Sequence, residues 1–368
     1  MASPEIIEVD SLLQPISEDN PVGVDIREDS SVSSPYYILK DARNSARAAE
    51  RKSMFDGSST EAEEHWRTIA STAPEVLTST SKDLEVATWL TEALLRRNGY
   101  QGLRDGFKLI HGLIENFWDN LYPMPDEDGM ETRVASLTGL NGEGAEGVLI
   151  APIRNVPLTE AGDPSPYAFW QYQQALEIQK ITDEEQRAEK ASKIGFSMDD
   201  ITNAVLNSSD SFYINTVDDL EQCIEEYRAI SQLLDQNCGT HEAPPTSNVI
   251  SVLQDCLGVA KHIGKNKLPV AEEATEAGEA GSASEGPGDA TAVARGHVQN
   301  RNEAFHQLAE ISEFFRKTEP HSPISYILEK AVRWGDMPLA DLVKELIPDS
   351  TARQFYGSLT GVKTEDEY

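Results

Sequence analysis

The sequence has no long uninterrupted run of hydrophobic residues. Nowhere does it contain the roughly 18 consecutive apolar residues that mark a membrane-spanning helix. Its first residues include Glu5 and Glu8 in place of the basic start and apolar core of a secretory signal. We therefore expect a cytoplasmic protein that is not inserted in a membrane.

Cysteine is scarce. Cys223, Cys238 and Cys256 are odd in number and far apart, which predicts free thiols in a reducing compartment and no disulfide framework. The sequence has neither a CxxC pair nor an HExxH motif, and its 7 histidines do not follow the spacing of metal ligands. We expect neither a metal nor a cofactor.

The signatures of common enzyme classes are absent too. The sequence has no phosphate-binding loop, no dinucleotide-binding glycine pattern and no nucleophile elbow. His321 and Ser322 could suggest a base and a nucleophile, but neighbouring side chains usually point apart. Pro323 after Ser322 instead predicts a helix start, with the serine as its cap. We expect no catalytic residue and therefore no enzyme.

Basic residues are in short supply. The chain has 31 Lys and Arg against 63 Asp and Glu, a net charge of -32. Such a charge repels nucleic acids and anionic membranes at long range. It favours solubility, or binding to a basic protein surface.

What the sequence does contain is hydrophobic residues at helical spacing, which predict an all-α, multi-domain protein. Residues 84–121 most clearly predict two antiparallel helices, because Asn98 and Gly99 interrupt the pattern. Thr216, with Asp219 three residues later, resembles a capping box that opens a helix. Around residues 141–168, prolines and β-branched residues predict irregular chain or short strands.

A chain of 368 residues is long for one core, so we expect several domains. Residues 1–160 are expected to form an N-terminal helical domain and residues 161–268 a middle helical region. Residues 269–296 consist almost wholly of small and acidic residues, which predicts a flexible acidic linker. Residues 297–368 are expected to form a C-terminal helical oligomerisation module.

The C-terminal module carries more aromatic side chains than a unit of its size can bury. Aromatic residues are favoured anchors of protein interfaces, and arginines beside them can pair with carboxylates of a partner. We therefore expect an oligomer interface that includes Phe314, Phe315, Arg316, Tyr326, Arg333 and Trp334.

Two blocks of sequence resemble a known family. LLQPISEDNPVGVDIRED at 12–29 and WLTEALLRRNGYQGLRDGFKLIHGLIENFWDNLYP at 89–123 are similar to the ImpA N-terminal domain that defines the TssA/ImpA family of type VI secretion subunits. Residues 301–349, with FFR, EPHSP and an Arg-Trp pair in that order, resemble the C-terminal region of the baseplate-type branch of that family.

The resemblance implies a non-enzymatic structural subunit of the type VI secretion system. Such a subunit would associate with baseplate, tail tube and sheath proteins and would form a homo-oligomer, a ring, through its C-terminal region. Two alternatives stay open from the residues alone. One is a monomeric helical adaptor, and the other is a helical enzyme whose site sequence motifs do not reveal.

Overall fold

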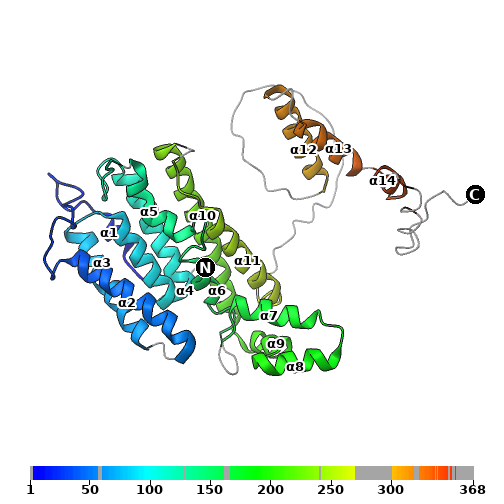
Figure 1. Ribbon diagram of the computed structural model, residues 1–368, viewed down its shortest axis with the longest axis horizontal. Coiled ribbons are helices and arrows are strands. Elements are labelled where there is room, and N and C mark those ends of the chain that lie inside the picture. Colours follow the sequence, from blue (N-terminus) through cyan, green and yellow to red (C-terminus); the bar gives the residue numbers. More distant parts are fainter. Residues whose placement is uncertain are drawn as a thin grey trace, which may run out of the picture. The chain divides into compact units, whose positions relative to one another are not determined.

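The computed structural model describes residues 3–56, 60–127, 129–160, 166–239, 242–269, 301–318, 323–335, 337, 339–346, 349 and 353. It divides the chain into two compact units, residues 1–274 and 275–368. Within the described residues, only isolated bridges and no longer strands accompany the helices, so the predicted all-α class is confirmed (Figure 1).

Eleven described helices belong to the first unit and three to the second. In the first unit they are α1 (Val9–Leu12), α2 (Pro35–Asp56), α3 (Thr60–Ser79), α4 (Leu84–Phe117), α5 (Met130–Asn141), α6 (Ile150–Asn155), α7 (Phe169–Gln179), α8 (Glu184–Ile194), α9 (Met198–Asn207), α10 (Asp210–Cys238) and α11 (Ser247–Ile263). In the second they are α12 (Arg301–Thr318), α13 (Ile324–Gly335) and α14 (Leu339–Leu346).

Helix α4 is a hairpin of two arms, as the sequence predicts. Gly99 has φ 61° and ψ -143°, a conformation outside the helical range that glycine adopts readily and that reverses the chain direction. The arms then approach closely. A Cβ on Gly106 would lie 2.6 Å from the Thr91 hydroxyl oxygen, so a side chain there would force the arms apart.

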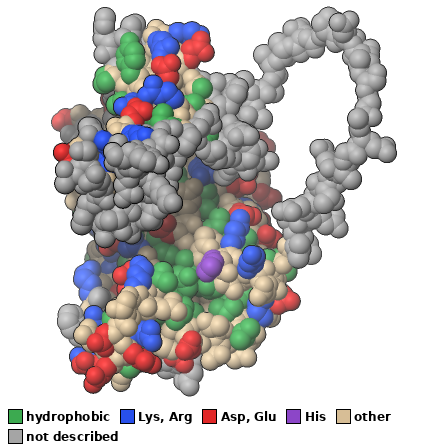
Figure 2. All heavy atoms as spheres, turned by 90° about the vertical axis from the view of Figure 1, so that its right-hand side faces the viewer, with side chains coloured by type: hydrophobic (Ala, Val, Ile, Leu, Met, Phe, Trp, Pro, Cys, Tyr) green, Lys and Arg blue, Asp and Glu red, His purple; other side chains and the backbone are tan. Residues whose placement is uncertain are grey.

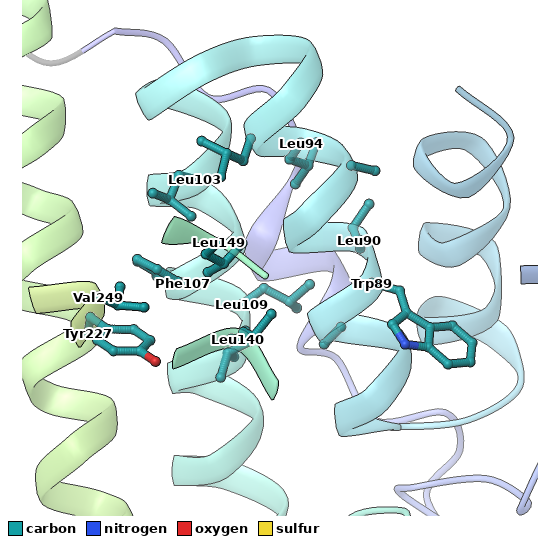
Figure 3. Packing of buried hydrophobic residues seen from close by; sticks show 14 of the residues in the cluster. Trp89, Leu90, Leu94, Leu103, Phe107, Leu109, Leu140, Leu149, Tyr227 and Val249 are labelled. Carbon is teal, nitrogen blue, oxygen red and sulfur yellow. The ribbon is translucent and has the colours of Figure 1, made fainter. Parts of the chain in front are cut away.

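One hydrophobic core joins the N-terminal and middle regions of the sequence. Figure 3 shows Trp89, Leu90 and Leu94 on one arm of α4 and Leu103, Phe107 and Leu109 on the other. Phe107 packs against Tyr227 of α10 with ring centroids 4.6 Å apart. The expected boundary at residue 160 therefore does not separate two cores, because α10 and α11 complete the core that α2, α3 and α4 begin. The division of this unit into domains stays a prediction.

A second, smaller cluster lies under α7, α8 and α9. Its buried aromatic residues are Tyr167, Phe196 and Tyr213. The region expected to be irregular or extended contains the short helix α6 and one isolated bridge, between Pro157 and Ala168. Tertiary packing of Ile150 and Ile153 against the main core accounts for this helical turn.

The expected helix start at Thr216 is wrong. Helix α10 begins at Asp210, where the Ser209 hydroxyl accepts a hydrogen bond of 3.2 Å from the backbone N–H of Phe212. Thr216 and Asp219 lie inside this helix. The helical pattern continues upstream of Thr216 because Tyr213 is fully buried and anchors an earlier turn.

In the second unit, α13 packs against α12 through small residues. The Ser312 hydroxyl donates a 2.7 Å hydrogen bond to the backbone carbonyl of Ser325, and both serines are buried. Short side chains allow the two helices to approach closely at this point. The expected linker at 269–296 lies outside the described residues except for Pro269.

Candidate interaction surfaces

Helix α13 exposes several of its large apolar residues. The exposed fractions are 42% for Ile324, 61% for Tyr326 and 62% for Ile327. Ser325 is buried and Leu328 is half-buried, and both lie on the side of the helix that meets α12. Ile311 and Leu346 are exposed in the same unit, so the described part of its surface carries an exposed apolar set of five residues.

The two arginines expected at an oligomer interface have partners within their own unit. Arg316 pairs with Glu329 and lies over the Tyr326 ring, 5.9 Å from its centroid. Arg333 Nη2 lies 2.7 Å from a carboxylate oxygen of Glu345. The isolated chain thus neutralises both guanidinium groups, while their use across an interface stays a prediction.

The aromatic residues expected at the interface differ in their exposure to solvent. Phe315 and Trp334 are half-buried, whereas Tyr326 is exposed. Phe314 lies on α12, and its side chain is outside the described part of the chain. Ile324 and Ile327 are exposed too, although the residues expected at the interface from sequence did not include them. The signal that could have found them is Ser325, a small residue suited to a close helix crossing.

A buried ionic cluster ties the start of the chain to two helices. Arg104 on α4 contacts Asp219 on α10 at 2.5 Å and donates to the Ser3 carbonyl at 2.7 Å. Asp105 accepts from the backbone N–H of Ile6 at 2.6 Å. Burial alone would lower the pKa of Arg104, but the two carboxylates raise it, so the guanidinium stays charged.

The three cysteines are free thiols, which confirms the prediction from sequence. Cys223 and Cys256 are buried, and burial raises the pKa of both, that of Cys256 to about 12. Buried protonated thiols are poor nucleophiles.

Two grooves in the described part of the first unit differ in charge. The larger, about 970 Å³, lies between the N-terminal segment and the end of α4, and Asp10, Glu115 and Asp119 make it acidic. The smaller, about 720 Å³, has four arginines in its lining: Arg47, Arg51, Arg96 and Arg97.

The face of the molecule in Figure 2 is of mixed character. Figure 2 shows acidic, basic and apolar side chains interspersed over the face that it presents.

Within the described residues, no three His, Cys, Asp or Glu side chains gather in a way that could hold a metal ion. None of the described helices is long and apolar enough to cross a membrane.

Comparison with known proteins shows which family the chain resembles. Residues 13–142 match the model of the ImpA N-terminal region of the type VI secretion system. The chain is 25% identical, over 98% of its own length and 100% of the relative, to the type VI secretion system component TssA1 of Pseudomonas aeruginosa.

A solved structure agrees with this similarity. The N-terminal domain of the TssA component from Burkholderia cenocepacia, which includes the conserved ImpA N-terminal region, is 26% identical, with a TM-score of 0.58 over 71% of this chain and 94% of that domain. A region of the chain therefore matches the model of the ImpA N-terminal region, and the resemblance of the chain to the TssA/ImpA family of type VI secretion subunits is confirmed.

Proposed function

We propose that this chain is a non-enzymatic structural subunit of a type VI secretion system and acts in the cytoplasm. The observation that carries the proposal is the similarity to TssA1, which extends over nearly the whole of both chains. A relative that matches over its whole length supports a shared role more strongly than a match to one domain does.

We further infer that the subunit forms a homo-oligomer, a ring, through its C-terminal unit. The exposed Ile324, Tyr326 and Ile327 support this inference, because a small helical unit gains stability by covering such residues with a second copy. Association with baseplate, tail tube and sheath proteins then follows from many weak contacts that a ring presents together.

Light scattering of the purified full chain tests the assembly. We expect a mass several times that of the 40.5 kDa chain at micromolar concentration. A monomeric mass would contradict the oligomer and favour the monomeric adaptor.

The role in secretion is tested separately in cells. In a bacterium whose own copy of this gene carries Tyr326→Asp together with Ile327→Asp, we expect fluorescent sheath proteins to stop assembling into extended tails. Normal tail assembly with a monomeric variant would contradict the link between the oligomer and the secretion machine.

A further inference from the structure

The smaller groove of the first unit combines a row of arginines with an apolar wall. Arg43, Arg47 and Arg51 are spaced four residues apart on α2, so they share one face of that helix. Arg96 and Arg97 approach from the end of the first arm of α4. The wall opposite is formed by residues at and around α6, namely Val148, Ala151, Pro152 and Val156.

Each of the three glutamates that line the groove already pairs with an arginine. Glu50 accepts from Arg96 at 2.5 Å and from the Trp66 indole N–H at 2.7 Å. Glu146 pairs with Arg154 at 3.2 Å. Glu63, which is half-exposed, lies 3.7 Å from Arg67 and 3.9 Å from Arg97.

Beneath the groove, Glu92 neutralises one end of the arginine row. Its side chain is fully buried, and one carboxylate oxygen lies 2.7 Å from Arg43. The other lies 3.7 Å from Arg96. Arg43 and Arg96 are therefore held in place from below, which fixes the shape of the groove floor.

Within the described residues, Arg47 and Arg51 have no carboxylate partner. Neither forms an ion pair or a side-chain hydrogen bond with any residue that the structure describes. Arg47 is half-buried, and its burial lowers the pKa of its guanidinium. Glu92 opposes that effect, whereas Arg43, Arg96 and Arg51 add to it. Within the described residues, the groove thus keeps two cations that no carboxylate pairs with, in a chain whose net charge is -32.

We propose that this groove binds a short acidic peptide segment of a partner protein. Arg47 and Arg51 would pair with its carboxylates, for which the guanidinium fork is well suited. Apolar side chains of the same segment would lie on the wall that includes Val148 and Val156. The size of the groove fits a few residues of peptide, and its apolar wall suits peptide side chains better than the phosphates of a nucleic acid. The proposal does not depend on assembly through the C-terminal unit.

Fluorescence anisotropy tests the proposal with the full chain. The probe is a short fluorescein-labelled peptide in which glutamates flank two leucines, and its control carries glutamine in place of each glutamate. We expect the glutamate peptide to bind and the glutamine peptide to fail, with binding that weakens as salt is raised. Equal binding of both peptides, or binding of neither, would overturn the proposal.

Variants locate the binding. Arg47→Gln with Arg51→Gln should weaken binding of the glutamate peptide by about tenfold or more. Arg228→Gln is the matched control, because Arg228 is exposed on α10 and has no ion pair with the described residues. Circular dichroism should show the same helix content in all three proteins. Unchanged affinity of the double variant overturns the proposal.

Two other occupants give distinct results. One variant replaces four glutamates of the acidic segment by glutamine, at Glu272, Glu273, Glu276 and Glu279. If this variant binds the probe more tightly than the unchanged chain does, the acidic segment of the chain itself occupies the groove, and the partner peptide is ruled out. If inorganic polyphosphate or single-stranded DNA competes as well as the unlabelled peptide does, the groove is a general anion site, and the proposal falls.

Discussion

Arg104 on α4 and Asp219 on α10 form an ion pair of 2.5 Å in the interior of the first unit, although 115 residues separate them in sequence. Their side chains are 1% and 4% exposed. Asp219 also holds the start of the chain, because the backbone N–H and the hydroxyl of Ser3 both donate to it. This pair therefore joins three segments that are distant in sequence.

We expect Asp219→Ala to destabilise the first unit by about 3 kcal/mol, because it leaves a buried guanidinium with one carboxylate fewer. Urea unfolding followed by circular dichroism measures the change. Glu221→Ala is the control on the same helix, since Glu221 and Lys261 form a half-exposed pair that should contribute less than about 0.5 kcal/mol. Equal losses in the two variants would contradict the importance of the buried pair.

The stability of the chain should rise with pH because of Lys82. Its ammonium is fully buried and donates to the carbonyls of Leu12 and Leu77, both at 2.6 Å, and burial lowers the pKa of Lys82 from 10.5 to about 8. Above pH 8 the folded chain therefore binds fewer protons than the unfolded chain, and the free energy of unfolding increases.

Lys82→Met should remove that increase, which we expect to be about 1 kcal/mol between pH 8 and pH 9. The window ends at pH 9 because burial also raises the pKa of Cys223 and Cys256, and such thiols reduce stability above their ordinary pKa of 9.0. Lys190→Met, on the exposed surface of α8, should leave the pH dependence unchanged. A slope that survives in Lys82→Met would refute the assignment.

Replacing either of two helical glycines by alanine should change the stability of the chain in opposite directions. Gly106→Ala should destabilise by about 1–3 kcal/mol, because the new Cβ would meet Thr91 of the other arm of α4 at 2.6 Å. Gly139→Ala should stabilise by about 0.5–1 kcal/mol, because a Cβ at this position of α5 has open space within 4 Å. Thermal unfolding of the two variants compares them directly, and a stabilised Gly106→Ala would mean that the arms separate more easily than their contact suggests.

The oligomer predicted above should depend on the outer face of α13. Ile327→Asp places a charge on a residue that is 62% exposed, so it should lower the mass of the assembly without unfolding the helices. Ala309→Asp adds the same charge at an exposed position of α12 outside the apolar set. Sedimentation should show a smaller particle only for Ile327→Asp, and the same size for both variants would place the interface elsewhere.

The sequence by itself determined the helical class, the reversal at Asn98 and Gly99, the free thiols and the resemblance to the family. Each of these depends on local spacing or on the presence of particular residues, which a single chain displays directly. The periodicity of α13 likewise shows that Ile324, Ile327 and Leu328 lie near one another, because residues three or four apart share a helix face.

Only the tertiary structure decided which faces and charges meet. In α13, Leu328 lies on the side of α12 while Ile327 is exposed. Asp219 is the partner of Arg104 and not a helix cap. Arg47 and Arg51 lie in the same groove as the arginines of α4. Helical periodicity specifies which residues share a face but not which other helix covers it. That choice depends on contacts between segments far apart in sequence, and the packing of the whole core determines them.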